Sequence, residues 1–215
     1  MALARPHETR LARWLGALSV AAGVAAGLVF LGRVTGFRSF VFAFELHFLL
    51  MFAASLIDVL LAPELDSPRF DVAPREVALY RRLGVIGFMR LLQRIGWTGA
   101  LRDPKVFDGT RATLASYERA TRHGENNHIW LFLLVLAPLS WAVVRGWWDA
   151  ALYLGSMNVV FHLYPILLQR TQRARLRGLL ERGARAAVER APQRGAPPPR
   201  DRASPATRAR SRHRE

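Results

Sequence analysis

The sequence contains no cysteine, and Lys105 is its only lysine. Without cysteine, disulfides, thiolate catalysis and cysteine-ligated metals are excluded, so any chemistry must use His, Glu, Asp, Ser, Thr or Tyr. Acidic residues are also scarce: 16 of them stand against 31 basic residues and leave a net charge of +15, although 51% of the chain is hydrophobic. A protein with a single soluble core does not usually combine so high a net charge with so large a hydrophobic fraction. The apolar and the basic residues are therefore expected in separate segments.

Two apolar runs near the start of the chain predict transmembrane helices. Residues 14–31 carry no charge and are long enough to cross a bilayer at about 1.5 Å per residue. Small residues crowd this run, as in a cleavable signal peptide, but it is longer than the apolar core of such a peptide, which favours a retained span. The second run, residues 40–61, contains Glu45, His47 and Asp58. The two acids either line a polar cavity or reach the membrane surfaces from the ends of the span.

Two further apolar runs, residues 129–144 and 150–168, are joined by a turn so short that they must form an antiparallel hairpin. Trp141, Trp147 and Trp148 cluster at this turn. Aromatic residues of this kind mark a membrane interface. The sequence thus predicts an all-α, polytopic integral membrane protein with about four transmembrane helices.

The charges that flank the spans predict their orientation. From residue 171 onward the chain carries thirteen arginines and four acids, and so basic a segment beside a span stays in the cytoplasm. Four spans then place both termini on the cytoplasmic side of a bacterial inner (plasma) membrane. Five segments follow: an N-terminal transmembrane hairpin (1–62), a cytoplasmic amphipathic segment (63–128), a C-terminal transmembrane hairpin (129–170), a basic amphipathic helix (171–190) and a disordered Arg/Pro-rich tail (191–215).

The cytoplasmic segment has apolar residues at helical spacing between Val77 and Ile95, with Arg81, Arg90 and Arg94 beside them. They predict one helix, which either lies on the membrane with its arginines toward anionic headgroups or packs against the cytoplasmic ends of the spans. The tail lacks apolar periodicity and cannot form a core. Its charge is expected to contact anionic lipid headgroups, because nothing in it resembles a folded nucleic-acid-binding module.

A group of polar residues just before the third span could carry chemistry. Thr121, Glu125 and His128 are spaced by four and three residues and so share one face of a helix. Because the third and fourth spans form a hairpin of nearly equal arms, this face meets the end of the fourth span at one membrane surface. The residues there are Gln169, Arg170, Arg173 and Arg175. The hairpin is therefore expected to bring an acid, a histidine and several guanidiniums together.

These residue types suit acyl transfer to a hydroxyl group. A histidine oriented by a carboxylate can take the hydroxyl proton at neutral pH, and His128 with Glu125 fits this role. Arg170 and Arg173 could hold the phosphates of an acyl-CoA or stabilise the oxyanion. The structural alternative is that Glu125 and His128 cap the helix while the arginines anchor it at the interface. Glu-x-x-His also occurs in di-iron bundles, but the chain has no second copy, so no metal is expected.

The same residues resemble the signature of the glycosyl-4,4'-diaponeurosporenoate acyltransferase family. That signature has Glu-Thr-x-x-Ala-Glu-x-x-His before one apolar span, Asn within the next, and Gln-Arg-Tyr-Asn-Arg-x-Arg-Leu after it. The matching residues here are Thr121, Glu125, His128, Asn158, Gln169, Arg170, Arg173, Arg175 and Leu176. Ala120, Gly124, Thr171 and Gln172 depart from it, which weakens the inference of substrate more than that of fold.

The resemblance implies a membrane acyltransferase that moves a fatty acyl group onto a hydroxyl of a lipid-embedded glycoside, either a carotenoid glycoside or a related glycolipid. No cofactor is expected, and acyl-CoA or an acyl-carrier thioester would be the co-substrate. Together with the chemistry above, His128 and Glu125 are the predicted catalytic residues, and the predicted substrate-binding residues are Thr121, Asn158, Gln169, Arg170, Arg173 and Arg175. The alternative function is a non-catalytic membrane protein that binds lipid or a partner enzyme.

Overall fold

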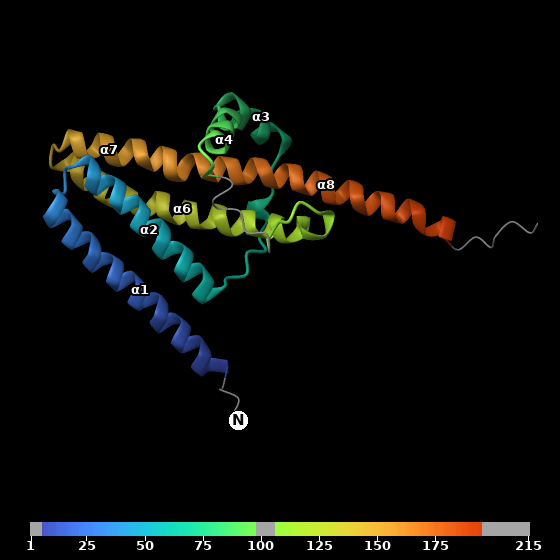
Figure 1. The fold of residues 1–215 in the computed structure, drawn as a ribbon, viewed down its shortest axis with the longest axis horizontal. Helices are drawn as coiled ribbons and strands as arrows, with labels where there is room; N and C mark the ends of the chain where they lie inside the picture. Colours follow the sequence, from blue (N-terminus) through green and yellow to red (C-terminus); the bar gives the residue numbers. More distant parts are fainter. Residues whose placement is uncertain (1–5, 98–105, 195–215) are drawn as a thin grey trace, which may run out of the picture. The chain divides into compact units, whose positions relative to one another are not determined.

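The computed structural model describes residues 6–97 and 106–194, and this part of the chain is helical and contains no strand. Its helices are α1 (Pro6–Thr35), α2 (Phe40–Leu61), α3 (Pro74–Arg82), α4 (Val85–Arg94), α6 (Leu114–Val144), α7 (Trp148–Asn158) and α8 (Tyr164–Arg194). Two short 3-10 turns, η1 (Pro68–Phe70) and η2 (Arg111–Thr113), and one π-helical turn, η3 (Val159–Leu163), complete it (Figure 1). The all-α prediction is confirmed.

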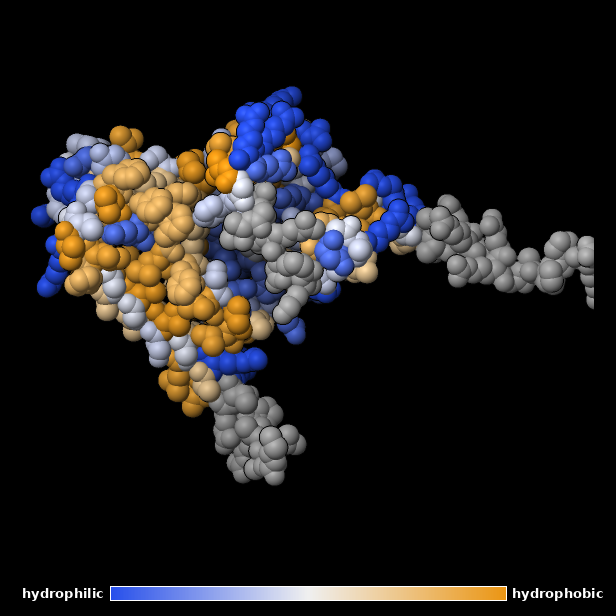
Figure 2. Space-filling view, viewed as in Figure 1, coloured by the Kyte–Doolittle hydropathy of each residue, from blue (hydrophilic) through white to orange (hydrophobic). Residues whose placement is uncertain are grey.

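Four helical stretches are long and apolar enough to cross a membrane: Arg10–Thr35, Phe40–Leu61, Arg111–Val144 and Trp148–Arg185. Large apolar side chains cover the outside of these stretches, among them Val59, which is 78% exposed, and Val144, which is 80% exposed. Figure 2 shows this hydrophobic surface over α1 and α2. A soluble monomer rarely exposes so much contiguous apolar surface. The four predicted spans are therefore confirmed, and the chain is a membrane protein.

The chain divides into two compact units, residues 1–178 and 179–215. The first unit holds the helices of both hairpins. In it, α1 packs along α2, and α2 packs against α6 and α7 (Figure 1). A core of buried apolar side chains forms where these helices meet, and it includes Phe42, Leu46, Val135 and Leu154. In the second unit, residues 179–194 continue α8. Residues 191–194 are still helical, and the rest of the tail, for which disorder was predicted, falls outside the described residues.

The turns of the two hairpins meet at one end of the first unit. Arg38, in the turn between α1 and α2, donates two hydrogen bonds of 3.0 Å from Nη2 to the carboxylate of Asp149, near the start of α7. The guanidinium of Arg145 lies 5.7 Å from the ring centroids of both Trp141 and Trp147. Arginine and tryptophan side chains suit the polar headgroup layer. The contact between the two turns puts them on the same side of the bundle, as the predicted four-span topology requires.

The second span has the predicted bounds, residues 40–61, whereas α6 begins well before the third apolar run. Ser39 caps α2 by accepting a hydrogen bond of 3.0 Å from the backbone N–H of Phe42. Helix α6 starts at Leu114, fifteen residues before the apolar run that begins at Ile129. An apolar run in the sequence shows only the part of a helix that faces lipid. The sequence therefore did not predict that the polar residues before Ile129 belong to the same helix. That polar half of α6 carries the candidate site.

The single helix predicted between residues 77 and 95 is wrong, because the segment forms two helices. Helix α3 ends at Arg82 and is capped by Leu83, and Gly84 has φ +81°, a left-handed conformation that glycine adopts without steric strain. Tyr80 and Val85 are buried against Leu168 of α8, so these two helices pack on the end of the fourth span. Their outer surface still exposes apolar and basic side chains, which are Leu79, Leu91, Ile95, Arg81, Arg82, Arg90 and Arg94.

Candidate active site

An ion-pair network joins the polar half of α6 to the start of α8. Glu125 is 2% exposed, accepts a hydrogen bond of 2.8 Å from Nη1 of Arg170, and pairs through its other oxygen with Arg173. The hairpin thus brings an acid and two guanidiniums together, as its geometry predicted. The partner of the carboxylate differs from the expected one, because the contacts of Glu125 are with the arginines and not with His128.

Arg170 uses all of its N–H groups in bonds to the protein. Nε donates to the hydroxyl of Tyr80 (3.0 Å), Nη1 to the carbonyl of Arg69 (3.1 Å) and to Glu125 (2.8 Å). Nη2 donates to the carbonyl of Asp71 (3.1 Å) and to Glu76 (2.7 Å). A guanidinium has five N–H donors, and all five have acceptors here. Binding of a donor phosphate by Arg170 would therefore require breaking bonds that hold residues 69–80 against α8.

Arg173 is the largest side chain with no exposed surface in the described part of the chain. Besides Glu125, it donates a hydrogen bond of 2.8 Å to the carbonyl of Phe70 and one of 3.4 Å to the hydroxyl of Thr121. Its guanidinium also lies 5.3 Å from the ring centroid of Phe70, which is fully buried. Charges removed from water to this extent are stable only when paired and hydrogen-bonded. Arg173 and Thr121 are thus parts of a buried structural contact.

The other predicted substrate-binding residues lie in different places. Gln169 packs its amide over Gly124, where an added Cβ would lie 2.8 Å from its Nε2, so α6 and α8 approach closely at this point. Asn158 donates a hydrogen bond of 3.2 Å to the carbonyl of Phe132 on α6. Arg175 is exposed on α8. The predicted set is therefore divided among the ion-pair network, the interior of the hairpin and the surface, and its role in binding substrate stays a prediction.

His128 belongs to a cluster of imidazoles inside the bundle. Its Nδ1 lies 3.3 Å from Nδ1 of His162, in the π-helical turn η3. The ring of His162 stacks on that of His47 from α2, with centroids 5.2 Å apart. Nε2 of His47, Nε2 of His162 and Oδ1 of Asn158 are buried without a hydrogen-bond partner. Within the described residues, no group of three or more His, Asp and Glu side chains is arranged to hold a metal ion.

A carboxylate–imidazole pair forms elsewhere, between α2 and α6. Nδ1 of His123 lies 3.0 Å and 3.1 Å from the two oxygens of Asp58. The His123 side chain is 35% exposed and that of Asp58 18%, so the pair is reachable from outside. A histidine held by a carboxylate in this way keeps its proton on Nδ1, which leaves Nε2 free to act as a base. This is the arrangement that was predicted for Glu125 and His128.

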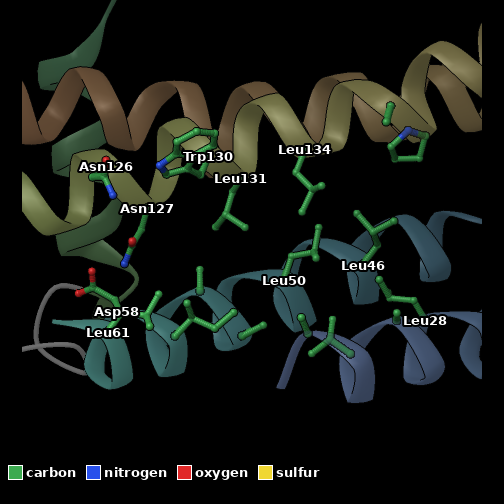
Figure 3. Close-up of a pocket in the computed structure, with 18 of the residues that line it drawn as sticks. Leu28, Leu46, Leu50, Asp58, Leu61, Asn126, Asn127, Trp130, Leu131 and Leu134 are labelled. Atoms are coloured by element: carbon green, nitrogen blue, oxygen red, sulfur yellow. The ribbon is translucent and has the colours of Figure 1, made fainter. Parts of the chain in front are cut away.

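Asp58 also lines one end of an apolar pocket of about 760 Å³ between α1, α2 and α6. Figure 3 shows Asn126 and Asn127 at the same end as Asp58, with leucines along the rest of the wall. Pockets for small ligands have volumes of about 300–1,000 Å³ and a few well-placed polar groups on mainly apolar walls. The pocket is thus of a suitable kind for a lipid chain with a reactive polar end.

A family model described as glycosyl-4,4'-diaponeurosporenoate acyltransferase matches residues 66–182, more than half of the chain. The chain belongs to this acyltransferase family. The resemblance noted in the sequence is thereby confirmed. No curated protein and no solved structure matches the chain.

The segment shared with the acyltransferase family contains the whole network of Glu125, Arg170 and Arg173, and also His123, His128 and His162. Asp58 lies before that segment, on α2. Sequence reasoning missed the pair of Asp58 and His123. Asp58 was conspicuous as an acid in an apolar run, but the chain has six histidines, and sequence alone did not show which one faces α2.

Glu76, on α3, is a further acidic partner of Arg170. Hydrogen bonds from the Tyr80 hydroxyl, then from the Ala73 backbone N–H and from Arg170, lower the pKa of Glu76 from 4.5 to about 2. The ionised form is thus favoured in the folded protein. A carboxyl group with a lowered pKa contributes stability above its unfolded pKa and loses it as the pH falls toward its folded pKa.

Replacing Glu125 with Gln should destabilise the protein by about 3–5 kcal/mol, because Arg173 is left buried without its counter-charge. Thermal or denaturant unfolding in detergent measures the change. Asp66→Asn is the matched control, since Asp66 pairs with Arg122 but is 93% exposed, and it should cost at most about 1 kcal/mol. A Glu125→Gln protein as stable as the wild type but unable to transfer acyl groups would instead support the catalytic role predicted from the sequence.

The acid sensitivity of the fold should depend on Glu76. Wild-type stability should fall as the pH is lowered from about 4.5 to about 2, where Glu76 takes up a proton. Unfolding measured across this range should show a smaller loss in Glu76→Gln, which has no proton to gain and is already less stable at neutral pH. Glu64→Gln, at an exposed site, should leave the wild-type profile unchanged. Equal acid profiles for the wild type and Glu76→Gln would contradict the assignment.

Proposed function

We propose that the chain transfers a fatty acyl group from a thioester donor, acyl-CoA or an acyl-carrier protein, to a hydroxyl of a membrane-embedded glycoside. The name of the family suggests glycosyl-4,4'-diaponeurosporenoate as the acceptor. Family membership supports the reaction class. The observation that carries the proposal is the contact of His123 with Asp58, which lines the polar end of the apolar pocket.

The pair suits the proton transfers that acyl transfer needs. Nδ1–H of His123 donates to Asp58, and Nε2 takes the proton of the acceptor hydroxyl as its oxygen attacks the thioester carbon. The resulting oxyanion collapses, the C–S bond breaks, and the leaving thiolate receives the proton from Nε2. The products are an ester and a free thiol. The side-chain amide of Asn127, which lines the same end of the pocket, can donate a hydrogen bond to the oxyanion.

The sequence predicted His128 as the general base, so His128 and His123 are alternative candidates for this role. Its Nδ1 faces another imidazole instead of a carboxylate, so nothing in its contacts fixes its tautomer as Asp58 does for His123. The expected role of Glu125 as the partner of His128 would require the carboxylate to leave two guanidiniums. The geometry therefore favours His123.

Replacing His123 with Ala should lower acyl transfer by about 10²–10⁴-fold, the usual cost of losing a general base. The assay uses protein in liposomes with palmitoyl-CoA and glycosyl-4,4'-diaponeurosporenoate, and mass spectrometry of the ester. Asp58→Asn should reduce turnover in the same direction, whereas the exposed Glu64→Gln should not. Full activity of His123→Ala combined with loss in folded His128→Ala would assign the base to His128.

We also propose that both termini and the segment between the hairpins are cytoplasmic. The thirteen arginines that follow residue 170 support this orientation. The contact between Arg38 and Asp149 supports a common side for both turns. The pocket's polar end would then face the side on which acyl-CoA is available.

The absence of cysteine makes the orientation directly measurable. A single cysteine at Phe37 or Arg145, exposed residues in the two turns, should react with a membrane-impermeant maleimide added to intact spheroplasts. A cysteine at exposed Glu64 should react only after the membrane is permeabilised. The opposite labelling would reverse the proposed topology, and labelling of the two turns from different sides would rule out four spans.

A further inference from the structure

The pocket follows a single face of α2. Its lining residues on this helix include Leu46, Leu50, Ala54, Asp58 and Leu61, spaced by three or four residues. Residues at this spacing form one stripe along a helix. Figure 3 shows the stripe facing α6, with α1 beside it. The pocket is therefore a groove that runs along the bundle.

The groove has two unlike ends. At one end lie the polar side chains of Asp58, Asn126 and Asn127. At the other end, Leu46 belongs to the buried core with Phe42 and Val135, and Leu28 packs against that core. The closely packed core closes the groove at this end. A ligand that fits it has one reactive polar end and one apolar end that stops inside the protein.

The length of the groove matches one lipid chain. Asp58 and Leu46 are twelve residues apart on α2, which corresponds to about 18 Å of helix rise. The hydrocarbon core of a bilayer is about 30 Å thick, so a chain in one leaflet spans about 15 Å. The distance from the carboxylate to the closed end is therefore suited to a single fatty acyl chain and too short for a ligand that spans the membrane.

We propose that this groove binds the acyl chain of the donor, with the thioester at Asp58 and the terminal methyl group against Leu28 and Leu46, so that the closed end selects chain length. This inference rests on the proposed function. The acceptor is embedded in lipid already and can present its hydroxyl from the bilayer. The donor is soluble, and its chain needs a place in which to be buried beside the reacting group.

Substitutions along the stripe should change the preferred chain length. Leu50→Phe fills the groove part-way and should shift both binding and transfer toward shorter acyl-CoAs, with a loss of about fourfold in affinity for each methylene that no longer fits. Leu46→Ala opens the closed end and should shift the preference toward longer chains. The matched controls are Leu56→Phe and Leu56→Ala, because Leu56 lies on α2 outside the groove and is 38% exposed. Both controls should keep the wild-type profile.

A photoreactive palmitoyl-CoA with a diazirine at its terminal carbon locates the chain without any need for turnover. In wild-type protein in nanodiscs, the crosslinks should fall on residues around Leu28, Leu46 and Pro138. Crosslinks in α7 or α8, or chain-length profiles of Leu50→Phe and Leu46→Ala equal to those of the controls, would overturn the inference. A changed affinity for the glycoside alone would assign the groove to the acceptor instead. Lack of turnover in the wild type would count against the proposed function only, because binding and crosslinking still test the groove.

Discussion

The burial of one guanidinium constrains the structure more than any other contact. Arg173 has no exposed surface, and Glu125 beside it is almost as deeply buried. Such a pair can lie inside a protein only if nearly every polar atom around it finds a partner. Arg170 supplies the rest of the arrangement by crosslinking Glu125 to Glu76 and to the backbone at residues 69 and 71. The segment between the hairpins is thereby fixed to α8 at several points.

This constraint separates the roles of neighbouring residues on α6. Glu125 and His123 are two residues apart, so their side chains leave the helix in nearly opposite directions. One faces the arginines of α8, and the other faces Asp58 on α2. The ion pairs thus hold α6 from one side while its opposite side borders the groove. The residues that the sequence suggested as one catalytic group are thus divided between two contacts, because Glu125 belongs to a buried ion-pair network and His123 belongs to a partly exposed pair with Asp58.

The spans were predictable because their signal is local. Residues 40–61 form an apolar run between a serine cap and a proline, and α2 has these bounds. The break at Gly84 was less apparent, since the apolar spacing continues across it and only the backbone conformation shows the turn.

The meeting of Glu125 with Arg170 and Arg173 followed from the equal arms of the hairpin. Spacing could not show which partner the carboxylate would have, because two guanidiniums, one of them fully buried, attract it more strongly than an imidazole does. Asp58 and His123 are 65 residues apart, and no local pattern connects them.

The pair of Asp58 and His123 joins a helix outside the shared family segment to one within it. The first hairpin is therefore more than a membrane anchor. It supplies the carboxylate, and α1 and α2 form two walls of the groove. Residues 66–182 taken alone would keep the buried arginines and lose both of these contributions. A protein that shares this segment but has a different first hairpin would thus keep the ion-pair network and lack both the partner of His123 and two walls of the groove.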